Sequence, residues 1–269
     1  MTESLPRAKL LAASACLFAA ALAAPERAAA DAGPPFLTND PGTPGNGNWE
    51  INIAAMQTTV PDESVWQLPQ LDVNYGLGER IQLSTEVPYV VVNRTGQPQA
   101  SGWGNANLGV KWRFYDKGEG GWSLSTFPMY QTGGSAEAQR KGTAAAGPRL
   151  FLPLEVARKV GWLSVDLEVG TYIPSGGGEH EDILGLVVGR QFSSRLELDV
   201  ELYGDHVHGA EYVTTLDVGG RYHLHRGINL LFMAGRSLSG NSSGQVEFMG
   251  YLGIQVLLTH YGRTLSEEP

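Results

Sequence analysis

The feature that most constrains this chain is a strict alternation of apolar and polar residues over stretches of about ten residues. In LPQLDVNYGLGERIQLSTEV, residues 68–87, Leu71 and Val73 alternate with Asp72, and the alternation resumes from Ile81 after a tight turn. Because successive side chains of a β-strand point to opposite faces, each stretch carries one apolar face and one polar face. The apolar faces must meet either a protein core or lipid.

Segments of this kind follow one another along almost the whole chain. We expect twelve strands, at residues 47–58, 66–76, 80–91, 105–115, 121–131, 147–156, 162–173, 182–192, 195–204, 212–224, 228–237 and 246–258. No stretch of comparable length has a helical pattern, and SAEAQRKGTAAAG, residues 135–147, is expected to form a loop because its flanks are rich in glycine. The predicted fold class is all-β.

The connections between these segments alternate in length. The short ones are residues 77–79, 116–120, 157–161, 193–194 and 225–227, and the long ones are residues 59–65, 92–104, 132–146, 174–181, 205–211 and 238–245. Short turns at one rim, longer loops at the other and an even number of strands are typical of bacterial outer-membrane barrels. The sequence therefore predicts a transmembrane up-and-down antiparallel β-barrel of about 12 strands over residues 47–258.

Charged residues concentrate on the strand faces that lie opposite aliphatic ones. In residues 195–204 the even positions are aliphatic, whereas the odd positions include Glu197, Asp199 and Glu201. If the aliphatic faces meet lipid, the charged faces line the lumen of the barrel. The lumen-lining candidates are Glu50, Asp72, Glu86, Lys111, Arg113, Arg149, Glu155, Asp166, Glu168, Glu197, Asp199, Glu201, Asp217, Arg221 and Glu247.

The predicted lumen leaves two alternatives open. Its candidates are eleven acids and four bases, so the field of an open passage would disfavour anions. Alternatively, opposite charges pair with one another and crosslink the wall from inside. Five apolar residues also point inward, and they either bind a hydrophobic or aromatic solute or pack against the segment that precedes the barrel: Phe151, Leu231, Met233, Met249 and Tyr251.

Aromatic residues gather near the predicted strand ends. Amphipathic rings favour the boundary between lipid and water, and membrane barrels carry girdles of them at both boundaries. The alternative is the ordinary aromatic core of a soluble antiparallel sandwich, but the joint placement favours a girdle. The girdle candidates are Trp49, Trp66, Tyr89, Trp103, Phe114, Trp122, Trp162, Tyr172, Tyr203 and Tyr222.

Residues 1–30 have the plan of a secretory signal peptide. Basic residues precede an apolar run, and small residues follow it, so we expect cleavage near Ala30 or Ala32. Cys16 is the only cysteine and lies inside this segment, so the mature chain is expected to have no disulfide and no thiolate metal site. The predicted destination is the bacterial outer membrane, with lipid as the surrounding partner.

Two further segments flank the predicted barrel. DAGPPFLTNDPGTPGNGN, residues 31–48, is dense in proline, glycine and asparagine and is expected to be irregular. We call residues 31–46 the lead-in segment. A tail, residues 259–269, follows the barrel. Without residues 1–30 the chain has 16 basic and 26 acidic residues, a net charge of about −10, which argues against nucleic acid as a partner.

The sequence offers little that points to catalysis. The G-x-S-x-G spacing occurs once, in GNSSG at residues 240–244, but this stretch belongs to a predicted loop and is not followed by the helix that a nucleophile elbow requires. The acidic pairs recur on several strands in the manner of a lining. Two H-x-H pairs, His206/His208 and His223/His225, are predicted to lie at opposite rims, so the four histidines cannot form one site. We therefore expect no enzyme, no cofactor and no metal site.

Three stretches resemble a known family. PPFLTNDPGTPGNGNWEINIA (34–54), LPQLDVNYGLGERIQL (68–83) and GWGNANLGVKWRFYD (102–116) are similar to the MetA-pathway of phenol degradation family of outer-membrane proteins. Asn39 stands where that family more often has an acid, and the chain continues through THYGRTLSEEP where barrel chains commonly end on an aromatic residue. The resemblance implies an outer-membrane barrel and suggests uptake of aromatic compounds. It brings no catalytic residues.

The predicted function is that of a passive channel or transporter for small solutes, with hydrophobic or aromatic molecules as candidates. The alternative is a non-conducting structural or surface-binding barrel whose lumen is closed by ion pairs and by residues 31–48. A narrow passage is sterically possible, because a barrel of about twelve strands lies between the eight-stranded size that side chains fill and the wide porins.

Overall fold

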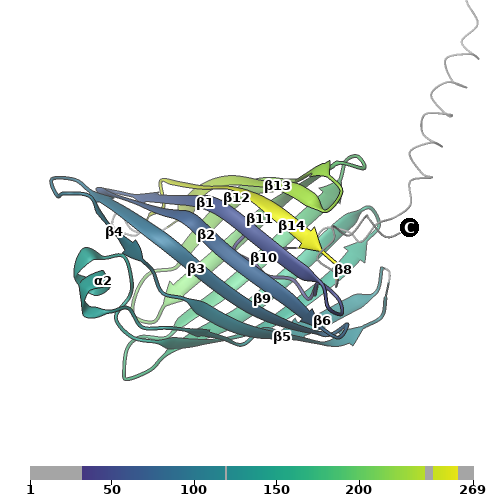
Figure 1. The fold of residues 1–269 in the computed structure, drawn as a ribbon, viewed down its shortest axis with the longest axis horizontal. Helices are drawn as coiled ribbons and strands as arrows, with labels where there is room; N and C mark the ends of the chain where they lie inside the picture. Colours follow the sequence, from purple (N-terminus) through teal and green to yellow (C-terminus); the bar gives the residue numbers. More distant parts are fainter. Residues whose placement is uncertain (1–31, 119, 240–244, 260–269) are drawn as a thin grey trace, which may run out of the picture.

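The computed structural model describes residues 32–118, 120–239 and 245–259 and shows a closed antiparallel β-barrel (Figure 1). Its strands are β1 (Trp49–Val60), β2 (Glu63–Leu77), β3 (Ile81–Arg94), β4 (Ala100–Trp103), β5 (Asn107–Asp116), β6 (Trp122–Thr126), β7 (Met129–Gln131), β8 (Arg149–Val160), β9 (Leu163–Pro174), β10 (Glu181–Gln191), β11 (Leu196–Val207), β12 (Val213–His225), β13 (Ile228–Ser239) and β14 (Phe248–Leu258). The one helix among these residues is α2 (Ala136–Lys141).

Two positions in the barrel wall are each occupied by two short strands, β4 with β5 and β6 with β7, so these strands make a 12-strand wall. β4 pairs with one half of β3 and β5 with the other half. β6 and β7 likewise pair with successive parts of β5 and β8. The first and last strands pair antiparallel from Trp49 with Leu258 onwards, which closes the ring. The prediction of an antiparallel barrel of about 12 strands is confirmed.

Three local predictions were wrong. The connection predicted at 59–65 is a tight turn between Val60 and Glu63, in which Asp62 has a φ of 66°. The loop predicted at 92–104 contains the short strand β4, because that stretch extends the β-ladder of β3. The loop predicted at 135–147 contains the helix α2.

Local chemistry explains why α2 forms despite its short length. Ser135 caps the first turn by accepting a hydrogen bond from the Ala138 amide, and Gly142 ends the helix with a left-handed φ of 72°. Lys141 pairs with Glu137 at 2.8 Å and lowers the pKa of that carboxyl. Figure 1 shows α2 beside β4, at the rim opposite the end of β14.

Several predictions concern residues outside the described ranges. The predicted signal peptide (1–30), with Cys16 and a cleavage site near Ala30, lies outside them, as does the tail from residue 260. Among the residues that are described, no helix has the length and apolar character needed to cross a membrane.

The outer face of the wall is aliphatic, and the inner face is polar and buried. Leu154, Leu202 and Val218 are exposed, whereas Glu155, Glu201 and Asp217 beside them are fully buried. The alternation between neighbouring positions follows from the two-residue period of a strand.

Aromatic residues are also exposed around the outer wall, near the strand ends. Six of the ten girdle candidates have exposed side chains: Trp49, Trp103, Phe114, Trp122, Trp162 and Tyr222. Tyr89 packs edge-on against Trp103, with ring centroids 5.4 Å apart, and Trp66 is half-buried on β2. Rings that the sequence argument did not include are exposed as well: Trp112, Tyr115, Tyr130, Phe192, Tyr212 and Phe248.

Two girdle candidates were assigned to the wrong face. Tyr172 stacks on Phe151 with ring centroids 4.3 Å apart and lies under the Arg149 guanidinium. Tyr203 shares a strand face with Glu201 and lies opposite Gly185 in the register of β10 and β11. Both tyrosines therefore face the lumen, because strand parity decides the face and nearness to a strand end does not.

Candidate functional site: the barrel lumen

The lead-in segment lies inside the barrel. The backbone amides of Leu37 and Thr38 donate hydrogen bonds to the Glu201 carboxylate at 3.2 and 2.7 Å, and the Asn39 amide donates to Glu168 at 2.8 Å. The Asn39 side-chain amide adds a bond to Glu168 at 3.1 Å. Two buried acids of the wall thus hold three consecutive backbone amides of this segment.

A glycine in the wall makes room for this contact. β10 runs between the strands of Glu168 and Glu201, and its residue at the crossing is Gly185. A Cβ atom at Gly185 would lie 2.0 Å from the Thr38 hydroxyl oxygen. Any larger residue would collide with the segment, so the close approach requires glycine.

A buried cation of the wall also binds the lead-in segment. The Lys111 ammonium on β5 donates to the backbone carbonyl of Asp40 and lies 3.7 Å from the Glu155 carboxylate. It also lies 4.8 Å from the centre of the Phe127 ring. Lys111 is 4% exposed, so this contact removes a backbone carbonyl and a charge pair from water together.

The apolar end of the lead-in segment packs on the inward apolar residues of the wall. Phe36 and Ala32 belong to one buried cluster with Ala54, Val187, Leu231, Met233, Met249 and Tyr251. The inward apolar residues were expected either to bind a solute or to pack against the preceding segment. Four of them, Leu231, Met233, Met249 and Tyr251, pack in the cluster with that segment. Phe151 is the exception, because its ring stacks on Tyr172.

The end of the lead-in segment is fixed at the rim of short turns. The Gly47 amide donates to the Gly76 carbonyl at 2.8 Å, and the Gly76 amide donates to the Asn48 carbonyl at 2.9 Å. A Cβ atom at Gly76 would lie 1.8 Å from the Gly45 carbonyl oxygen. The segment thus runs from this rim into the lumen beside β2.

A chain of polar side chains crosses the wall nearer the long-loop rim. Gln70 donates to Glu86 at 2.6 Å, Asn107 donates to Glu86 at 3.0 Å, and Gln131 donates to Asn107 at 3.0 Å. Arg149 extends the chain, because its guanidinium bonds Gln131 at 2.6 Å and Glu181 at 2.5 Å. Six strands therefore contribute to one hydrogen-bonded belt.

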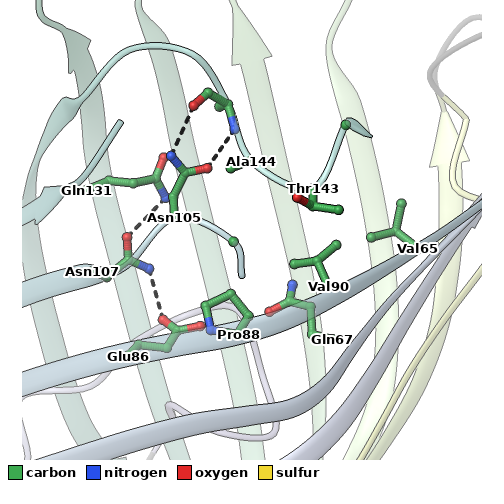
Figure 2. Close-up of a pocket in the computed structure, with 13 residues that line it drawn as sticks. Val65, Gln67, Glu86, Pro88, Val90, Asn105, Asn107, Gln131, Thr143 and Ala144 are labelled. Atoms are coloured by element: carbon green, nitrogen blue, oxygen red, sulfur yellow. Dashed lines mark hydrogen bonds between the residues drawn. The ribbon is translucent and has the colours of Figure 1, made fainter. Parts of the chain in front are cut away.

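The belt borders a pocket of about 270 Å³. Figure 2 shows Glu86, Asn107 and Gln131 on one side of it, with the belt bonds drawn. Val65, Pro88 and Val90 supply an apolar side. The lining of the pocket thus combines hydrogen-bonding and aliphatic groups.

The loop that carries α2 forms another wall of this pocket. Its residues 142–145 line the pocket together with the inward residues of β3. Asn105 holds the loop in place by donating to the Ala145 carbonyl at 3.1 Å and accepting from the Ala145 amide at 2.7 Å. A loop of the long-loop rim therefore lies across part of the barrel mouth.

A second polar network covers the wall from β1 to β3. Asn52 donates to Glu50 and Asp72 at 3.0 and 2.9 Å, and Asn74 donates to Asp72 at 3.0 Å. Gln82 then donates to Asn74 at 2.9 Å. Neutral amides thus donate to both acids of this network.

The remaining lumen candidates occupy several depths. Glu197, Asp199 and Asp166 are buried on the inner face, and Arg221 is the register partner of Glu197. Arg113 lies at the short-turn rim, where it donates to the Glu79 carbonyl at 2.6 Å. Glu247 is exposed and precedes β14 at the opposite rim.

Several lumen residues escaped the sequence argument because they are neutral. Asn52, Asn74, Asn107, Gln82 and Gln131 join the two networks but carry no charge that would mark a polar face. Their inward parity was available from the two-residue period of each strand.

Comparisons with known proteins support the architecture. No family model matches the chain, and no curated protein matches it in sequence. Among solved structures it is similar to the COG4313 outer membrane channel from Pseudomonas putida F1, with a TM-score of 0.62, 14% identity and coverage of 86% of this chain and 100% of that one. The KdgM porin in complex with disordered oligogalacturonate has a TM-score of 0.55 at 13% identity, covering 77% and 98% of the two chains. The NanC porin has a TM-score of 0.54 at 10% identity, again covering 77% and 98%. At such identities the likeness shows that this chain has the fold of outer-membrane β-barrels.

Proposed function

We propose that the protein is a passive channel of the bacterial outer membrane for small solutes, narrowed by its own lead-in segment. The observation that carries the proposal is a closed 12-strand wall with an aliphatic outer face and a hydrogen-bonded polar inner face. Lipid can surround only the aliphatic outer face, and the passage of water-soluble solutes requires the polar inner face. The similar solved structures include channels and porins of the same architecture.

The outer-membrane location rests on three features of the wall. Aromatic rings are exposed near the strand ends, the short turns after β2, β8, β10 and β12 share one rim, and the outer face between the rims is aliphatic. We propose that residues 1–30 direct secretion and are removed near Ala30 or Ala32.

The pocket beside the belt sets the scale of the proposed solute. A volume of about 270 Å³ suits a small molecule, and its lining combines Glu86 and Asn107 with Val90. We include aromatic compounds among the proposed solutes, since the chain resembles the MetA-pathway of phenol degradation family and the pocket has an apolar side. No catalytic activity and no cofactor are part of the proposal.

Liposome swelling tests the proposed function. Vesicles containing the folded mature chain are expected to swell in small neutral solutes and to stop swelling as the solute grows beyond the pocket, because a narrowed lumen excludes by size. Protein-free vesicles give the background rate. Equal swelling rates with and without protein, for both the mature chain and a chain lacking residues 32–46, would contradict conduction.

The second candidate is a non-conducting barrel closed by the lead-in segment. Its support is the number of independent anchors on that segment, from the Glu168 and Glu201 carboxylates to the Phe36 cluster. The channel differs from this candidate in one respect, which is whether a passage remains beside the segment. The recordings described in the Discussion distinguish them.

A further inference from the structure

A cluster of three metal-binding side chains lies on the outer wall at the long-loop rim. Asp182, His206 and His208 each offer a ligand atom, and these atoms lie within 4.8 Å of one another. His208 Nε2 lies 2.8 Å from the Asp182 carboxylate. Asp182 is 24 positions before His206 in the sequence and comes beside it only through the pairing of β10 with β11.

The β-ladder fixes this arrangement. Asp182 and His206 are direct register partners on β10 and β11. The ladder continues one step further, because the His208 amide donates to the His180 carbonyl at 2.8 Å. His206 and His208 point to the same side because they are two residues apart. The backbone thus presents all three ligands on one face without any loop rearrangement.

The cluster is accessible from outside the barrel. Asp182 shares its strand face with Leu184 and Leu186, and His206 shares its face with Leu202, so all three ligands lie on the outer side of the wall. Asp182 and His208 are exposed, and His206 is half-buried. The Tyr212 ring stacks on His206 at a centroid distance of 4.0 Å and supports that ring from one side.

We propose that Asp182, His206 and His208 form a binding site for a divalent transition-metal ion of the zinc class. Imidazole and carboxylate ligands in a set of three, with a position left open, suit zinc, copper or nickel. Tetrahedral ligands at zinc distances lie about 3.3 Å apart, so the three ligand atoms, which here lie within 4.8 Å of one another, must move slightly closer together to bind one ion. The His180 ring stacks on His208 at a centroid distance of 5.9 Å and borders the three ligands.

Calorimetric titration with Zn²⁺ tests this site on the folded mature chain, prepared without a polyhistidine tag. We expect one Zn²⁺ per barrel. The affinity should be more than about tenfold weaker in His206→Ala and in His208→Ala, because loss of a residue that only hydrogen-bonds to a metal ligand already weakens affinity by about 10- to 100-fold. Binding of Co²⁺ in place of Zn²⁺ should give the visible absorption of a tetrahedral site. Calcium and magnesium should not compete, because they prefer all-oxygen ligands.

The second H-x-H pair supplies the matched control. His225→Ala removes a histidine of the same spacing at the opposite rim and should leave Zn²⁺ affinity unchanged. Heat-modifiable migration on gels checks that each variant is folded. The proposal is overturned by the absence of saturable Zn²⁺ binding, by undiminished binding in His206→Ala, by equal losses in His225→Ala, or by competition from Ca²⁺.

Discussion

Replacing Leu202 with arginine is expected to destabilise the folded barrel by about 2–4 kcal/mol, the cost of a basic residue on the lipid face at the middle of a bilayer. Leu202 lies midway along β11, and its register partners Leu186 and Leu216 continue the aliphatic outer face to both sides. Leu202 is 42% exposed, and the proposed membrane location places lipid against it. Urea titration in lipid vesicles, followed by gel migration, measures the change.

Two substitutions serve as controls for the charge at Leu202. Leu202→Met keeps the volume and apolar character and should cost less than about 1.5 kcal/mol. Leu224→Arg places the same charge beyond the exposed Tyr222 near the end of β12, where the cost should fall to about 0–1 kcal/mol. Equal losses at Leu202 and Leu224 would contradict the assignment of a lipid-facing band.

The structure also shows that Leu202 is a better position for the charge than one chosen from the sequence alone. The alternation of residues 68–87 alone suggests Val73 as a lipid-facing test position. Val73 is only two residues from Tyr75, which pairs with Trp49 in the register of β1 and β2. That is roughly 5 Å of depth from the aromatic boundary for a tilted strand, so a charge there should cost less than one at Leu202.

Deletion of residues 32–46 is expected to raise the single-channel conductance of the barrel several-fold. The segment occupies the lumen through the bonds of Thr38 to Glu201 and Asn39 to Glu168 and through the Phe36 cluster. Strand β1 begins only at Trp49, and Gly47 remains to pair with Gly76, so the deletion leaves the wall complete. Planar-bilayer recordings measure the effect.

A substitution in the wall provides an independent version of this test. Gly185→Val keeps the whole chain but places side-chain atoms where Thr38 now lies, so it should also raise the conductance. Gly204→Ala is the control, because a Cβ atom there meets its nearest neighbour at 3.8 Å, an ordinary contact, on the outer face of β11 and away from the lead-in segment. Unchanged conductance in both the deletion and Gly185→Val would mean that the segment does not restrict the passage.

The fold could be predicted largely from one property of the sequence. A two-residue period sustained over many segments specifies both the strands and their faces, and Leu202 and Glu201 were assigned to opposite faces on that basis. The errors occurred where another factor decides. Nearness to a strand end suggested a girdle for Tyr172 and Tyr203, but parity turns both rings inward.

The candidate site was predicted less completely because its contacts are long-range. Thr38 and Glu201 are 163 positions apart, and nothing in the local pattern of either residue indicates the other. Gly185 is an ordinary strand glycine in the sequence, and only the three-dimensional crossing of Thr38 over β10 explains it. Asp182 and His206 similarly become neighbours only through the register of β10 and β11.

The measurement that tests the central claim most directly is the reversal potential of the mature chain in a planar bilayer with a KCl gradient. We predict a stable current whose reversal potential indicates cation selectivity, because the lumen candidates include more acids than bases. The deletion of residues 32–46 should keep that sign at higher conductance. Anion selectivity, or no current from either chain, would contradict the account.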